Sequence, residues 1–386
     1  MTSGGERNQA VGEHRVTPLE LFFDLVFVFA LTQVTGLLVD DSTWTGVLHA
    51  MLVLAALWWA WNVYAWLTST VDVDEGGIRL TMLASMAAML FVALAVPGAF
   101  GDDGVLFGCA YLLVRLLHLL LSAFVARGDS ARRGALVRFV PTTVVAGLLL
   151  VAAGFVDGSV RVALWVCALA IDYLGPSVVG MGRGWRVEAE HFAERHGLVI
   201  LVALGESVVA IGIGVGTDLA AGVLLAAGLG IALVSALWWL YFDVAAIFAR
   251  TQLMEADGVE RARLARDSYG YLHLPLVAGI VLLAFGVETT LHDVGAMLAT
   301  VPAVALCGGV TLYLFGHVAF LYRATRHLFR RRTIAAVVLL AMIPLARVVP
   351  ALVLLGLVTA ACWLVVAYEA IRHRSARGSI RHGDTA

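Results

Sequence analysis

Long apolar stretches alternate with short polar breaks along almost the whole chain. A transmembrane helix needs about 20 apolar residues. Runs of this kind recur at 19–39, 44–67, 79–100, 104–126, 135–155, 160–181, 195–217, 220–248, 268–290, 298–322, 333–348 and 350–371. The breaks carry aspartate, serine and glycine, as at 40–42, 101–104 and 157–159, which is turn chemistry. The pattern therefore predicts about twelve transmembrane helices.

The first span carries its own start signal. Thr17 is placed as an N-cap, Pro18 stands at the first helical position, and Glu20 completes a capping box. We therefore expect a helix that begins at residue 18 or 19 and remains in the mature protein.

Composition supports lipid as the main solvent of the chain. Of the 386 residues, 61% are hydrophobic and 14% are charged, and the mean hydropathy is +0.91. Soluble domains are nearer half apolar and a quarter charged. The fold class expected is an all-α integral membrane protein. The net charge of −2 gives no indication of nucleic acid as a partner.

The basic residues are distributed unevenly between the two sides of the predicted spans. All 26 are arginine, and all except Arg115, Arg161 and Arg347 fall in, or within one helical turn of, the N-terminal segment, the loops after even-numbered spans, or the C-terminal tail. Arginine accumulates on the cytoplasmic side. We therefore expect an inner-membrane protein with both termini cytoplasmic, and with 1–18, 182–194 and 372–386 as cytoplasmic N-terminal segment, linker and tail.

Similar motifs recur in the two halves, 19–181 and 195–371. Residues 29–33 line up with 202–206, the tryptophan run 57–61 lines up with 237–241, His118 matches His317, and 132–133 matches 331–332. Six spans in each half predict two parallel six-helix repeats, related by an axis along the membrane normal. Coincidence is the alternative, because tryptophan at interfaces and arginine in inner loops are common.

Two motifs resemble those of the bacterial low temperature requirement protein A (LtrA) family. The first motif is ELFFDLVFVFA with Thr32 and Gln33 after it, and contains Glu20, Phe23 and Asp24; the second contains Glu194, Arg195, Gly197, Gly205 and Glu206. His196 departs from the family pattern, where an aromatic or apolar residue is expected. The resemblance extends over nearly the whole chain. It implies a bacterial inner-membrane protein linked by name to growth in the cold, with no established activity.

Ionisable residues within the spans are candidates for function, because each costs about 2.5–3.5 kcal/mol in a membrane even on mild insertion scales. Glu206 lies near the middle of its span and is followed by Gly212, Gly214 and Gly216. These glycines suit a site with unwound chain; alternatively, Gly212 and Gly216 form a helix contact and Glu206 is a structural hydrogen-bond acceptor.

Arg115 and His118 are three residues apart and therefore share one helix face. A buried arginine needs a carboxylate partner, for which both Glu206 and Asp172 are at suitable depth. The pair could form a charge relay or an anion clamp, or a static ion pair.

Asp24 lies four residues after Glu20 on the same face, whereas Gln33 points to the opposite side. Capping accounts for Glu20. Asp24 is a candidate for a cytoplasmic gate or a substrate contact.

Other polar and aromatic residues near the span ends are expected to reach water or the lipid interface. These are Asp243, His273, His317, Glu369, Glu288, Arg347 and the tryptophans Trp58, Trp59, Trp61, Trp66, Trp238 and Trp239. No His-x-x-x-His or Glu-x-x-His spacing predicts a metal site, and no motif predicts a cofactor.

These features favour a secondary transporter, with proton coupling through Glu206 or through Glu206 with Asp24. No P-loop is present, and we favour a non-enzymatic role. The alternatives are a membrane-embedded enzyme acting on lipids and a non-catalytic sensor or scaffold. The expected partners are the lipid bilayer and an unidentified small solute. Whether the chain forms a homo-oligomer stays open.

Overall fold

The computed structural model describes residues 16–71, 73, 75–179, 185–217, 219–326 and 329–372. Most of the predicted N-terminal segment, the first three residues of the predicted linker and all but the first residue of the predicted tail lie outside these residues. Within them the regular structure is entirely helical. In the first half the helices are α1 (Pro18–Asp40), α2 (Trp44–Thr68), α3 (Gly76–Leu94), α4 (Gly104–Val125), α5 (Ser130–Ala153) and α6 (Gly158–Val179).

The second half contains longer, interrupted helices. It comprises α7 (Ala189–Val215), α8 (Ala221–Leu240), α9 (Ala246–Glu255), α10 (Gly258–Leu264), α11 (His273–His292), α12 (Thr300–Thr325), α13 (Arg330–Met342) and α14 (Ala351–Arg372). Short π-helical segments join α8 to α9 and α10 to α11, at η1 (Tyr241–Ala245) and η2 (Ala265–Tyr271). The chain between the predicted spans 220–248 and 268–290 is thus largely helical as well.

Eleven helices of the described residues are long and apolar enough to cross a membrane, one fewer than the sequence predicts. The difference is the predicted span 333–348. Here α13 ends after 13 residues and continues as the 3-10 turn η3 (Ile343–Arg347). Pro344 explains the break, because proline lacks an N–H and its ring clashes with the preceding turn.

The short helix α13 still takes the chain from one end of the bundle to the other. At its start, Arg332 pairs with Glu369 near the end of α14, at 2.9 Å. After η3, the backbone N–H of Ala351 donates to the carbonyl of Ala296 in the α11–α12 loop. The start of α13 and the start of α14 therefore lie at opposite ends.

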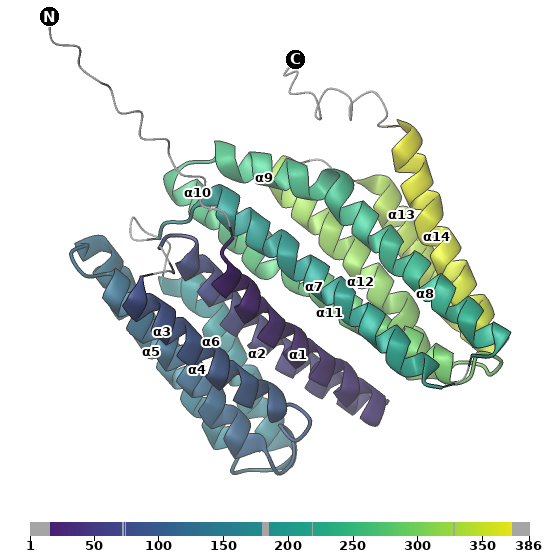
Figure 1. The fold of residues 1–386 in the computed structure, drawn as a ribbon, viewed down its shortest axis with the longest axis horizontal. Helices are drawn as coiled ribbons and strands as arrows, with labels where there is room; N and C mark the ends of the chain where they lie inside the picture. Colours follow the sequence, from purple (N-terminus) through teal and green to yellow (C-terminus); the bar gives the residue numbers. More distant parts are fainter. Residues whose placement is uncertain are drawn as a thin grey trace, which may run out of the picture.

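Helices follow the same neighbour order in both halves. In the first half, α1 contacts α2 and α3, helices α3 to α6 pack consecutively, and α2 packs on α6. In the second half, α7 contacts α8 and α11, helices α11 to α14 pack consecutively, and α8 packs on α14. Figure 1 shows the two halves side by side, with α1 and α7 adjacent where they meet.

Helices α1 and α7 run in the same direction along this boundary. Near the start of each helix, Asp24 contacts Arg195, and further along, Thr32 contacts Glu206. Helix α11 packs against both. Its contact with α7 passes through Gly214, where an added Cβ would lie 2.9 Å from the Cβ of Leu291, whereas Gly212 meets open space. The expectation that Gly212 and Gly216 form the helix contact is therefore wrong for the interface between α7 and α11.

Tryptophans of α2 form part of the core instead of an interfacial belt. Trp58, Trp59 and Trp61 are at most 2% exposed, whereas Trp238 on α8 is 43% exposed. The indole N–H of Trp58 donates to the carbonyl of Gly270 in η2, at 2.7 Å. This hydrogen bond satisfies the indole of Trp58 inside the protein. All three tryptophans are buried, so the belt expectation is wrong for them.

Candidate functional site between α1 and α7

The capping box predicted at the start of α1 is present, and its glutamate has a second role. The side chain of Thr17 accepts from the backbone N–H of Glu20, whose Oε2 accepts from the backbone N–H of Thr17 at 3.0 Å. The same Oε2 lies 3.0 Å from Nε2 of His191 on α7. Glu20 is only 1% exposed, so it connects the two helices as well as capping one of them.

Arg195 of α7 joins both acidic residues of the first motif. Its Nη1 donates to Oε1 of Glu20 and its Nη2 donates to Oδ1 of Asp24, both at 2.7 Å. Thr68 on α2 accepts a further bond from Nη1 at 3.2 Å. We call Glu20, Asp24, His191 and Arg195 the Arg195 cluster.

The Arg195 cluster is shielded from solvent. Arg195 is fully buried, and the indole N–H of Trp61 donates to the same Oδ1 of Asp24 at 2.8 Å. The guanidinium also lies 5.7 Å from the centre of the Trp61 ring. Asp24 Oδ2 and Arg195 Nε have no hydrogen-bond partner among the described residues, so the network is incompletely satisfied. Ionisable residues inside a membrane protein are costly and are therefore candidates for function.

Glu206 lies further along the same interface, without an arginine. Thr32 of α1 donates a hydrogen bond to its Oε2, and Thr35 provides a second hydroxyl. Oε1 is buried and has no hydrogen-bond partner among the described residues. Within that part of the chain, no basic side chain forms an ion pair with Glu206.

A second carboxylate approaches Glu206 from α11. Glu288 is only 6% exposed and interacts electrostatically with both Glu206 and Asp40, which lies at the end of α1. The expectation that Glu288 reaches water is wrong, because α7 and α1 cover it. His273 and His317 are likewise buried within the bundle.

The Arg195 cluster, Glu206 and the pair of Glu288 and Asp40 follow one another along α1, across the molecule. At 1.5 Å per residue, Asp24 and Thr32 are about 12 Å apart along α1, and Thr32 and Asp40 are again about 12 Å apart. The Arg195 cluster thus lies toward the end where arginines gather, Glu206 lies midway, and Glu288 with Asp40 lies toward the other end. We call this arrangement the α1–α7 line.

The other motif residues contribute unequally to this site. Phe23 and Gly197 are buried, whereas Glu194 and Gly205 are exposed on the outer side of α7. Gln33 is half-buried and is not a hydrogen-bond partner of Glu206. His196, the unusual residue of the second motif, lies 3.3 Å from the side-chain oxygen of Asn62.

Arg115 belongs to a separate buried pair. Its Nη2 donates to Oδ1 of Asp172 at 3.0 Å and to the hydroxyl of Thr143 at 3.2 Å. Tyr111 donates to the other oxygen of Asp172 at 3.0 Å. Of the two partners that the sequence left open for Arg115, the structure therefore selects Asp172, and Glu206 is independent of it.

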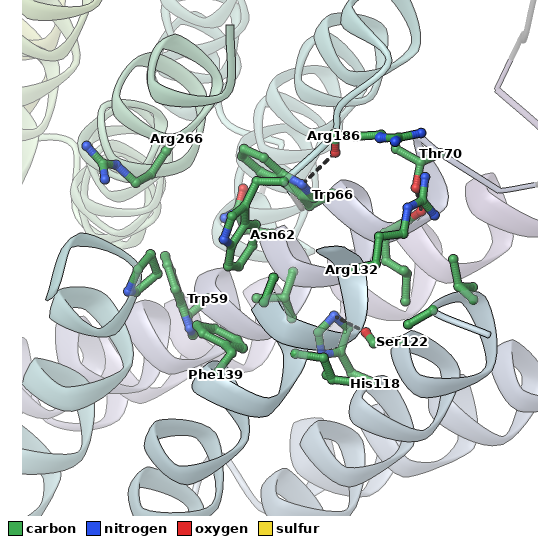
Figure 2. Close-up of a pocket in the computed structure, with 18 residues that line it drawn as sticks. Trp59, Asn62, Trp66, Thr70, His118, Ser122, Arg132, Phe139, Arg186 and Arg266 are labelled. Atoms are coloured by element: carbon green, nitrogen blue, oxygen red, sulfur yellow. Dashed lines mark hydrogen bonds between the residues drawn. The ribbon is translucent and has the colours of Figure 1, made fainter. Parts of the chain in front are cut away.

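A cavity of about 130 Å³ lies on the other side of α2. Figure 2 shows Trp59, Asn62 and Trp66 of α2 on its wall, together with His118 and Ser122 of α4. The ring of His118 lies 3.5 Å from the Ser122 hydroxyl. Asn62 also contacts His196, so α2 separates the cavity from the Arg195 cluster by one layer of side chains. Sequence reasoning missed the cavity because four α-helices, the π segment η2 and the segment before α7 form it.

Within the described residues, no three His, Cys, Asp or Glu side chains are grouped as a metal site would require.

Comparison with known proteins identifies the family. The family model of the bacterial low temperature requirement A protein (LtrA) matches residues 15–367. The chain belongs to the LtrA family. It is also similar to an uncharacterized protein of Rhizobium meliloti (strain 1021), with 31% identity over 318 residues, which cover 77% of this chain and 75% of that protein. No solved structure matches.

The two LtrA motifs of this chain meet in space. Glu20 and Asp24 from the first motif bind Arg195 from the second, and Glu206, also from the second, binds Thr32 just beyond the first. Both motifs therefore contribute to the α1–α7 line in a multi-pass membrane protein.

Proposed function

We propose that this LtrA protein is a secondary transporter of a small solute, coupled to protons through Glu206. The observation that carries the proposal is the environment of Glu206, which lies buried midway along α7. Among the described residues, one of its carboxylate oxygens has no hydrogen-bond partner and no basic side chain pairs with it. An ionisable residue in such a position is costly unless its charge is used or compensated.

Glu288 strengthens the proton-coupling proposal. Two carboxylates that repel each other in a medium of low dielectric constant favour taking up a cation between them, and a proton is the smallest one. In this proposal, Glu206 receives the proton from the side of Asp40 and Glu288. Release toward the opposite side requires a path past the Arg195 cluster.

The Arg195 cluster suits the role of a gate. Its ion pairs hold the first turns of α1 and α7 together, and Arg195 binds two carboxylates at once. Separation of these turns would open Glu206 toward the arginine-rich end, while closure would leave it open only toward Asp40. Alternating exposure of one site to two sides defines secondary transport.

The neighbour order of the helices supports two six-helix repeats with an axis along the membrane normal. Each half presents its first helix, α1 or α7, at the boundary, and these two run in the same direction. The uneven arginine distribution supports a cytoplasmic position for the arginine-rich end, in a bacterial inner membrane. In this arrangement the Arg195 cluster is the cytoplasmic gate.

Solute-driven proton movement in proteoliposomes tests the proposed function. A pH-sensitive dye inside the vesicles reports proton entry after addition of single anionic, cationic or neutral solutes from a panel. At least one solute should drive proton movement with the natural protein. Glu206→Gln should reduce that rate at least tenfold, because glutamine keeps the shape but cannot carry a proton.

The matched control is Asp102→Asn, which removes an exposed carboxylate from the α3–α4 loop and should leave the rate unchanged. Because Glu206 has no cationic partner in the part of the chain that the structure describes, Glu206→Gln should change the free energy of unfolding by less than about 1 kcal/mol. Unimpaired proton movement in Glu206→Gln, or no solute-driven proton movement across the panel, would contradict the proposal.

A further inference from the structure

The cavity beside α2 has an apolar interior. Its walls include the rings of Trp59 and Trp66 from α2, Phe139 from α5 and Trp185 from the segment before α7. These are rigid, flat surfaces that match a flat or extended hydrocarbon body. The indole N–H of Trp185, another wall residue, is buried without a hydrogen-bond partner among the described residues.

The mouth of the cavity is positively charged. Arg132 and Arg186 lie together at one side of it in Figure 2, and Arg266, which pairs with Asp267 at 2.7 Å, lies at the other side. Arg132 and Arg186 are both 3.7 Å from the carboxylate of Asp129, so two guanidinium groups share one counter-charge. Hydrogen bonds from the backbone N–H groups of Arg132 and Ala131 lower the pKa of Asp129, which is therefore ionised at neutral pH.

Among the described residues, this counter-charge leaves one positive charge uncompensated at the mouth. Arginine presents several N–H donors in a planar fork that fits carboxylate, phosphate and sulfonate oxygens. Arg186 is 64% exposed and Arg132 is 22% exposed, so both can reach a bound anion. The position of the mouth, at the end of the bundle where arginines gather, adds further positive potential.

We propose that this cavity binds an organic anion with an apolar body. The anionic group lies at Arg132 and Arg186, and the apolar part lies between Trp59, Trp66 and Phe139. The ligand is either a free organic acid or the end of an anionic lipid, since both present this chemistry. The proposal does not depend on transport, because the cavity is separated from the α1–α7 line by α2.

Equilibrium binding of radiolabelled 2-naphthoate to the full chain tests the proposal. The chain is placed in nanodiscs of phosphatidylcholine, and 2-naphthamide serves as the uncharged competitor. We expect saturable binding of naphthoate, with naphthamide at least tenfold weaker. Arg132→Gln and Arg186→Gln should each weaken binding about tenfold, because each removes a charge-assisted hydrogen bond. Ala135→Phe should abolish binding by filling the cavity that Ala135 lines.

Arg133→Gln is the matched control, because Arg133 is exposed, adjacent in sequence and absent from the cavity wall. It should bind naphthoate like the natural chain. Repeating the measurement with phosphatidylglycerol in the nanodiscs separates the two sources: competition identifies the lipid, and undiminished binding identifies a free acid, and either result supports the site. Non-saturable binding, or affinity unchanged by both Arg132→Gln and Ala135→Phe in variants with natural melting temperature, would overturn it.

Discussion

Arg195 illustrates how one buried residue can hold two helices together. Its two Nη atoms contact different carboxylates, Glu20 and Asp24, which lie one turn apart on α1. Removing one partner of a buried ion pair costs about 3–5 kcal/mol, because the remaining charges lose their compensation. Here two acidic residues would lose their arginine at once, although Glu20 keeps its contact with His191.

We therefore expect Arg195→Gln to lower the free energy of unfolding by about 3–5 kcal/mol. Arg195→Lys should fall between this variant and the natural chain, because a single ammonium group cannot bridge both carboxylates with the same geometry. Unfolding of the purified chains in one detergent measures both effects. Arg133→Gln, at an exposed position, is the control. Equal stability of Arg195→Gln and the control would contradict the assigned role.

For single residues, the sequence predicts which side chains share a helix face, but not which residues of other helices they contact. Helical spacing places Glu20 and Asp24 on one face, and the structure confirms this through their shared contact with Arg195. Spacing does not say which helix covers that face, so Arg195 had no predicted partner. For Arg115, depth alone left both Asp172 and Glu206 open, because residues far apart in sequence can share a depth on different helices.

At the scale of helices, close backbone contact explains the tight packing of α11 on α12. A Cβ added at Gly309 would lie 2.7 Å from the carbonyl oxygen of Gly279, and a Cβ at Gly279 would lie 2.5 Å from the carbonyl oxygen of Gly309. Glycine is needed at both positions, because any side chain would push the helices apart. The adjacent Gly308 meets only Val304 of its own helix, at 3.6 Å.

Gly309→Ala should therefore destabilise the protein by about 1–3 kcal/mol through overpacking. Gly308→Ala should leave stability unchanged or raise it slightly, because alanine favours the helix and space is available. The two alanine variants differ by one position, so their melting temperatures compare packing directly. Equal melting temperatures would show that α11 and α12 are not in contact through these glycines.

Helix boundaries follow from the sequence more closely than helix contacts do. The cap at Thr17 and Pro18 starts α1 as predicted, because capping is a local interaction. The predicted span 333–348 is too short in the structure and is broken at Pro344. This break could have been predicted from the sequence, because proline interrupts a helix. The buried tryptophans of α2 were not predictable, because hydropathy does not separate the core of a membrane protein from its lipid surface.

At the scale of the whole molecule, the proposed orientation can be tested with reporters. Fusions after Arg133, Arg263 and Arg331 should read as cytoplasmic, because arginine-rich loops stay on that side. Fusions after Asp41, Asp103 and Asp157 should read as external. Reporter signals of opposite sign at two or more of these positions would overturn the proposed orientation and number of crossings.

The proposal of transport along the α1–α7 line can be tested by measuring from which side of the membrane the line is accessible to water. A transporter must expose Glu206 to each side in turn, an enzyme acting on lipids would open it to one side, and a scaffold would open it to neither. Ser207 is adjacent to Glu206, and its buried hydroxyl has no hydrogen-bond partner among the described residues. Cysteine differs little from serine in size, so it is a conservative probe of this position.

The decisive measurement is labelling of Ser207→Cys, in a chain whose four natural cysteines are replaced by alanine. A membrane-impermeant thiol reagent is added to one side of oriented vesicles at a time, and the labelled fraction is measured by mass. Our account predicts labelling from either side, with labelling from the arginine-rich side slowed by the closed Arg195 cluster and accelerated in Asp24→Asn. Labelling from only one side, or from neither, under both conditions would contradict transport through the α1–α7 line.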